Sequence, residues 1–98
     1  MITHIVLFKF KDDTTDNQIQ KAKNMIEALK DKVPTLKQIE VGVNFADEDR
    51  AMDMSLLSTF DDRVGLDEYA THPIHLEVIA YIKSIASYTK VVDYETQN

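Results

Sequence analysis

Residues 2–10 constrain the fold most, because they alternate as a β-strand that is apolar on both faces. One face would present Ile2, His4, Val6, Phe8 and Phe10, and the other Thr3, Ile5, Leu7 and Lys9. A strand with one face in water normally alternates apolar and polar side chains more cleanly. The pattern therefore predicts a sheet with helices on one face and a partner sheet on the other.

A helix is expected after this strand. The run Thr15-Asp16-Asn17-Gln18 fits a capping box, and Pro34 ends the pattern that follows. Between them, apolar residues recur every three or four positions: Ile19, Ala22, Ile26, Leu29 and Val33. This spacing forms one apolar stripe on a helix, which would pack against the sheet.

Three more strands are expected. Two lie over residues 36–45 and 52–60, joined by the acidic loop 46–50, and the last lies over residues 88–95. Each combines apolar residues with a strand-like alternation or β-branched side chains. Together with the first strand they would form one sheet.

A second helical region precedes the last strand and is interrupted at His72-Pro73. Asp61 and Asp62 suit the start of a short helix that runs to about Ala70. Pro73 suits the first turn of a new helix, because the missing N–H has no helical partner to lose there. The element order is β-α-β-β-α-β, which predicts a ferredoxin-like α+β fold with a broken second helix.

The composition fits one globular domain over residues 1–98, with 44% hydrophobic and 29% charged residues. The net charge of −6 and the dispersed lysines argue against nucleic-acid binding, which needs clustered cations. No apolar run approaches the ~20 residues of a membrane span, and the N-terminus lacks the pattern of a signal peptide. We therefore expect a cytoplasmic protein with no membrane or nucleic-acid partner.

Tyr69 and His75 are the first candidates for chemistry. His75 would lie in the first turn of a helix, where the partial positive charge lowers its pKa, and a neutral imidazole can act as a general base. Tyr69 could donate its hydroxyl to a carbonyl oxygen in the same pocket. Both also have a structural interpretation, His75 as a polar residue at the rim beside Ile79 and Tyr69 as a half-buried ring over the core.

His4 and His72 are weaker candidates. The neighbours of His4 are apolar, so its face should meet the helices, where a histidine is more often a hydrogen-bonded core residue than a catalyst. His72 precedes a proline, which favours an extended backbone and a capping or solvent-exposed ring. A zinc site formed by His4, His72 and His75 is disfavoured, because the break at Pro73 divides the last two between a loop and a helix. We expect neither a metal nor another cofactor.

Three segments, taken in order, resemble the stress-responsive A/B barrel (Dabb) family: His4-Ile5-Val6-Leu7-Phe8-Lys9-Phe10-Lys11, His72-Pro73-x-His75 and Val92-Asp93-Tyr94. The resemblance covers nearly the whole chain. It implies a ferredoxin-like protomer and a homodimer, a dimeric α/β barrel in which two four-stranded sheets face each other with the helices outside. Burial of Ile5 and Leu7 in such an interface would contribute about 1.5–3 kcal/mol per side chain.

The resemblance also implies site residues. In a plant polyketide cyclase that the chain distantly resembles, a histidine of the His-Pro-x-His motif is the base for an intramolecular aldol condensation, and its position matches His75. Tyr69, His4 and Asp93 match further positions of that site, and Asp93 would orient the His75 ring. Ile26 stands where the cyclase has a tyrosine, so the pocket differs and the substrate does not carry over.

Three functions remain as alternatives. The first is a cofactor-independent acid–base enzyme, similar to a cyclase or a lyase, acting on a small apolar carbonyl or phenolic compound. In it, His75 is the base, Tyr69 holds the oxygen and His4 assists. The second is a non-catalytic dimer that acts in the stress response or binds a small molecule. The third is a cofactor-free monooxygenase that acts on quinol-like substrates.

Overall fold

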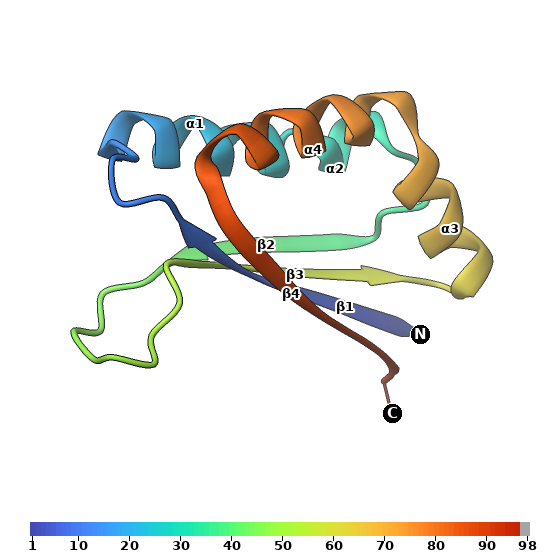
Figure 1. The fold of residues 1–98 in the computed structure, drawn as a ribbon. Coiled ribbons are helices and arrows are strands. Elements are labelled where there is room, and N and C mark those ends of the chain that lie inside the picture. The colour runs from blue at the N-terminus through green and yellow to red at the C-terminus, as the bar shows by residue number, and fades with distance from the viewer. Residues whose placement is uncertain (97–98) are drawn as a thin grey trace.

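A four-stranded antiparallel sheet forms one layer of the molecule, and helices cover one of its faces (Figure 1). The structure is a computed structural model that describes residues 1–96. Along the chain the elements are β1 (Ile2–Phe10), α1 (Asp16–Glu27), α2 (Leu29–Lys32), β2 (Gln38–Val43), β3 (Met54–Phe60), α3 (Arg63–Thr71), α4 (Pro73–Ile85) and β4 (Ala86–Glu95). No helix in the described part of the chain is long and apolar enough to cross a membrane.

The sheet order is β2-β3-β1-β4, which places β1 in the interior beside β3 and β4. All neighbouring strands pair antiparallel. This is the ferredoxin-like α+β arrangement, and it confirms the fold expected from the order of elements. The register sets His4 opposite Ser58 of β3 and Asp93 of β4, so these three side chains share one face of the sheet.

Local signals determine where the helices begin. Thr15 and Gln18 form the predicted capping box of α1, because each side chain accepts the backbone N–H of the other residue. Asp62 caps α3 by accepting a backbone N–H in the first turn. The break between α3 and α4 lies at His72, as predicted; its backbone is extended, and its Nδ1 accepts the N–H of Ile74 at 3.1 Å.

The first helical region differs from the single continuous helix that the apolar stripe predicts. It divides at Ala28 into α1 and the short α2. The N–H of Asp31 bonds to the carbonyl of Ala28, three residues back, so the chain here is wound more tightly than an α-helix. The apolar stripe remains buried across this division.

The strands occupy somewhat different ranges from those expected. β2 ends at Val43, because the side chain of Asn44 accepts the N–H of Ala46 and turns the chain. β3 begins correspondingly later, at Met54, and β4 begins at Ala86, directly after α4.

The core lies between the helices and the inner face of the sheet, which is the face that carries His4. The predicted helical stripes supply much of it: Ala22, Ile26, Leu29, Val33, Val78, Ile82 and Ile85. The opposite, outer face carries apolar side chains that remain open to solvent in the protomer. Leu57 is 36% exposed, Val92 53% and Tyr94 45%.

Candidate functional site

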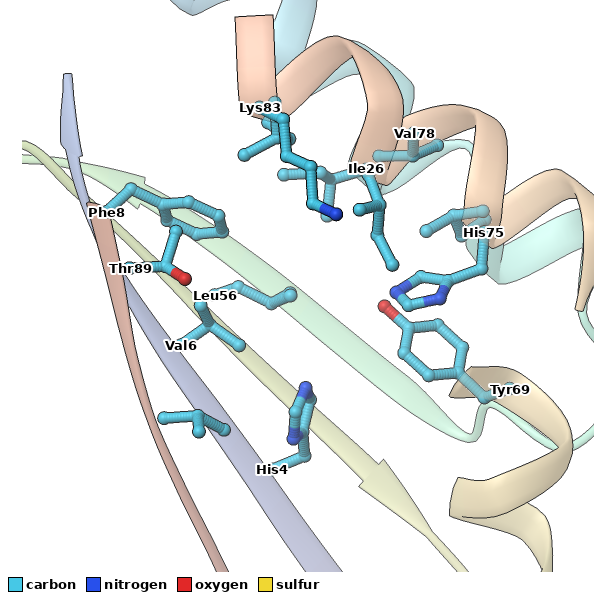
Figure 2. A pocket seen from close by; sticks show the side chains of 14 residues that line it. His4, Val6, Phe8, Ile26, Leu56, Tyr69, His75, Val78, Lys83 and Thr89 are labelled. Carbon is cyan, nitrogen blue, oxygen red and sulfur yellow. The ribbon is translucent and has the colours of Figure 1, made fainter. Parts of the chain in front are cut away.

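A cavity of about 280 Å³ lies between α4 and the inner face of the sheet (Figure 2). Strand residues form its floor: His4, Val6, Phe8, Leu56, Thr89 and Val91. Helix residues form its roof and one end: Ile26, Leu29, Tyr69, His75, Val78, Ile79, Ile82 and Lys83. The volume is close to the lower limit of about 300 Å³ for small-molecule sites, so the cavity suits a small ligand.

The structure brings three of the four predicted site residues to this cavity. The ring centroids of Tyr69 and His75 are 4.2 Å apart, and those of His4 and Tyr69 are 6.2 Å apart. Alternation along β1 turns His4 to the inner face. The extended backbone at His72 turns the chain between α3 and α4, and this turn places Tyr69 beside His75.

Tyr69 is the most deeply buried member of the site. Its side chain is 1% exposed, and its hydroxyl has no hydrogen-bond partner within residues 1–96. Burial raises the pKa of Tyr69 to about 12, because the phenolate would be poorly solvated. The residue is therefore a protonated phenol near neutral pH, with a buried hydroxyl that has no acceptor among the described residues.

His75 is half-buried and held by one hydrogen bond to the backbone. Its Nδ1 lies 3.1 Å from the carbonyl oxygen of Ala70. A carbonyl oxygen only accepts, so Nδ1 carries the proton in the neutral ring and Nε2 holds the free lone pair. The pKa of His75 is lowered, first by burial and further by the nearby His4 and His72, while the bond to Ala70 opposes the shift. The pKa of His75 is lowered as expected, but the main cause is burial and not the helix N-terminus.

Asp93 contacts His4 and not His75, which corrects the expected role of this carboxylate. The register of β1 and β4 sets the two residues directly opposite each other, and Oδ1 of Asp93 pairs with Nδ1 of His4. The partner of His75 is the Ala70 carbonyl. Asp93 therefore contacts the candidate site only through His4 and does not line the cavity.

The other residues weighed from the sequence have clear places. His72 caps α4, which is the structural role favoured for it. Ile26 is buried and lines the cavity, so the substitution relative to the cyclase falls inside the pocket. No group of three His, Asp or Glu side chains within residues 1–96 is arranged to hold a metal ion.

Sequence reasoning missed Lys83 and Thr89, which also line the cavity. A lysine on an amphipathic helix is usually a solvated residue, and a threonine in an edge strand carries no signal of its own. The spacing of His75 and Lys83 was the available clue, because side chains about two turns apart lie on the same side of a helix.

Comparisons with known proteins agree with this architecture. The profile of the stress responsive A/B barrel domain, Dabb, matches residues 2–96. An uncharacterized protein of Streptomyces coelicolor is 30% identical over 97 residues, and the alignment covers 97% of this chain and 99% of that protein.

Two solved structures illustrate the shared fold. A dimeric ferredoxin-like protein of unknown function from Bacteroides fragilis has a TM-score of 0.87 and 33% identity, and the match covers 97% of this chain and 95% of that one. A hydroxynitrile lyase from Passiflora edulis has a TM-score of 0.85 at 23% identity, covering 95% of this chain and 90% of that one. The second likeness is one of fold alone.

The match to the family covers nearly all of the chain. This chain therefore belongs to the stress responsive A/B barrel (Dabb) domain family.

Proposed function

We propose that this chain is a cofactor-independent acid–base enzyme that removes a proton next to the carbonyl of a small, mostly apolar compound. One observation supports this proposal above others. A buried phenol without a hydrogen-bond partner in the described protomer lies beside an imidazole whose pKa is lowered. The phenol can donate to a carbonyl oxygen while the imidazole takes a proton from the adjacent carbon.

The proton transfer follows from the two side chains. Nε2 of His75 takes the α-proton, and the electron pair of that C–H bond becomes the C=C bond of an enolate. The hydroxyl of Tyr69 donates to the enolate oxygen, where the negative charge develops. The enolate carbon then either forms a C–C bond with a second carbonyl of the same molecule or expels a leaving group one carbon further along. The His75 imidazolium returns its proton to the resulting alkoxide or leaving group.

The cavity supports this chemistry in size and character. Apart from the site residues and Lys83 and Thr89, its lining consists of aliphatic and aromatic side chains. Apolar walls exclude water and strengthen hydrogen bonds to a developing charge. A correctly placed acid or base typically accelerates such a step about 10²–10⁴-fold. The pair formed by His4 and Asp93 supplies a second imidazole close to Tyr69, suited to hold or orient the substrate.

The proposal includes a homodimer formed through the outer face of the sheet. Ile5, Leu57 and Val92 are neighbours on this face, since Ile5 pairs with both of the others across β1. Exposed apolar area of this kind favours burial against a partner. The Bacteroides fragilis protein of the same fold is described as dimeric. A dimer would leave the cavity, on the inner face, free to bind ligand.

The test compares the wild type with His75→Ala and with Lys32→Met, a control that removes an exposed charge outside the cavity. Small ketones, β-diketones, phenols and short polyketide-like acids are screened by thermal shift, and compounds that bind are assayed for turnover. A ligand at 100-fold its Kd should stabilise the fold by about 2.7 kcal/mol. We expect turnover by the wild type and the control, and none by a folded His75→Ala. Equal turnover by His75→Ala would remove this residue from the mechanism.

Ligand binding without catalysis is the second candidate, supported by the largely apolar lining. It predicts compounds that shift the thermal transition of the wild type but undergo no turnover. The quinol monooxygenase alternative stays a prediction, for which oxygen consumption in the presence of a quinol is the readout.

A further inference from the structure

We propose that the cavity selects ligands that carry a carboxylate, and that Lys83 binds this carboxylate at the cavity mouth. The inference rests on the proposed function, since it names the class of compound that the site of Tyr69 and His75 would take. The ligand would be an apolar monocarboxylic acid whose reactive carbonyl lies at the far end from the carboxylate.

The first support is the position of Lys83 on α4. It follows His75 by about two helical turns, so the two residues share one side of the helix, about 12 Å apart along its axis. Side chains on a helix lean toward its N-terminus, which directs Lys83 back over the cavity. Figure 2 shows its side chain reaching into the space above the sheet, with Phe8 and Thr89 on the facing wall.

The second support is that Lys83 stands apart from the carboxylates of an acidic chain. No ion pair within residues 1–96 involves Lys83, and no Asp or Glu is among the residues that line the cavity. An ammonium group at the mouth of an apolar cavity attracts a single anionic group.

The third support is the gradient of burial along the cavity. Lys83, Thr89 and Val91 are exposed, so the cavity meets solvent beside β4. Tyr69 and Ile26 are only 1–2% exposed at the inner end. A carboxylate at the mouth would keep part of its hydration, pair with Lys83 and accept a hydrogen bond from the hydroxyl of Thr89. The apolar remainder of the ligand would then lie inside, with its carbonyl at Tyr69.

A monocarboxylate fits these groups better than a phosphate. One lysine and one hydroxyl would leave the second charge of a phosphate monoester unpaired, and the net charge of −6 opposes a dianion. Lys83 is therefore a residue that determines substrate specificity, and it takes no part in the proton transfer.

The experiment measures the Kd values of octanoate and octan-1-ol by titration calorimetry, for the wild type and three variants. Lys83→Met keeps the aliphatic stem and removes the charge, Lys83→Arg keeps the charge, and Lys32→Met is the control for net charge. We expect the wild type to bind octanoate more tightly than octan-1-ol. Lys83→Met should raise the Kd of octanoate about tenfold and leave the Kd of octan-1-ol unchanged. Lys83→Arg and Lys32→Met should bind both compounds as the wild type does.

Two results would overturn the assignment of Lys83. One is an unchanged Kd for octanoate in a Lys83→Met variant whose thermal unfolding matches that of the wild type. The other is a wild type that binds octanoate no better than octan-1-ol, or binds neither. This experiment measures binding, so its outcome is independent of the proposed reaction. Turnover retained in His75→Ala would refute the proton transfer by His75. It would not change the ratio of the affinities for octanoate and octan-1-ol.

Discussion

The ring of Tyr69 lies 4.2 Å from the imidazole of His75, between ring centroids, although the two residues belong to different helices. The extended backbone of His72 ends α3 and caps α4, and so turns the chain between them. The helix break that His72-Pro73 predicts is therefore also what assembles the candidate site.

Tyr69→Phe should stabilise the fold while it impairs the site. The hydroxyl is buried and has no partner within residues 1–96, and an unsatisfied buried hydroxyl reduces stability by about 1 kcal/mol or more. We expect chemical denaturation to give an equal or larger free energy of unfolding for the variant, with weaker binding of ketones. A variant less stable than the wild type by about 1 kcal/mol would mean that the hydroxyl has a structural partner.

His75 should make the fold less stable as the pH falls. Its pKa is lower in the folded state than in the unfolded chain, so between the two values the unfolded chain binds more protons. By linkage, the free energy of unfolding then decreases as the pH drops below about 6.5 toward the lowered pKa. Urea denaturation at about pH 7.5 and about pH 5.5 should show that the free energy of unfolding decreases more for the wild type than for His75→Asn. Equal decreases would mean that the pKa of His75 is not lowered in the folded state.

His4 and Asp93 should be energetically coupled, whereas His75 and Asp93 should not. Oδ1 of Asp93 contacts Nδ1 of His4, and Asp93 is partly exposed, so we expect a coupling of about 0.5–1 kcal/mol. The measurement is a double-mutant cycle of unfolding free energies with His4→Ala and Asp93→Ala. A parallel cycle with His75→Ala and Asp93→Ala is the control. A larger coupling energy in that cycle than in the cycle with His4 would mean that Asp93 acts on His75, as the resemblance implies.

Val92→Asp should dissociate the proposed dimer without unfolding the protomer. Val92 is 53% exposed on the outer face, so a carboxylate there is tolerated in a monomer but would be buried in a dimer interface. Val64→Asp is the matched control, because Val64 is 65% exposed and belongs to α3, not to the outer face of the sheet. Light scattering should report the mass of two chains for the control and of one chain for Val92→Asp. Two chains for both variants would exclude this interface.

Features that depend on neighbouring residues could be predicted from the sequence. The capping box of Thr15 and Gln18 and the break at His72-Pro73 are of this kind, because each involves residues a few positions apart. The apolar stripes also predicted which helix faces are buried. The division at Ala28 was missed, since alanine is a good helix former and carries no signal for a tighter turn.

The partner of Asp93 could not be predicted, because it depends on the register between two strands far apart in the chain. His4 and Asp93 are 89 residues apart and meet only through the pairing of β1 with β4. A shift of one residue in that register would turn Asp93 to the outer face. The resemblance assigned Asp93 to His75, and this assignment was wrong; only the fold identifies His4 as the histidine that Asp93 contacts.

The most direct measurement is deuterium exchange at the carbons next to the carbonyl of 2-octanone, followed by proton NMR in D₂O. It detects proton abstraction without knowledge of the natural substrate. We expect the wild type and Lys32→Met to accelerate exchange about a hundredfold or more over folded His75→Ala, and Tyr69→Phe to be clearly slower than the wild type. Exchange by the wild type at the same rate as His75→Ala would mean that His75 does not act as a base beside Tyr69.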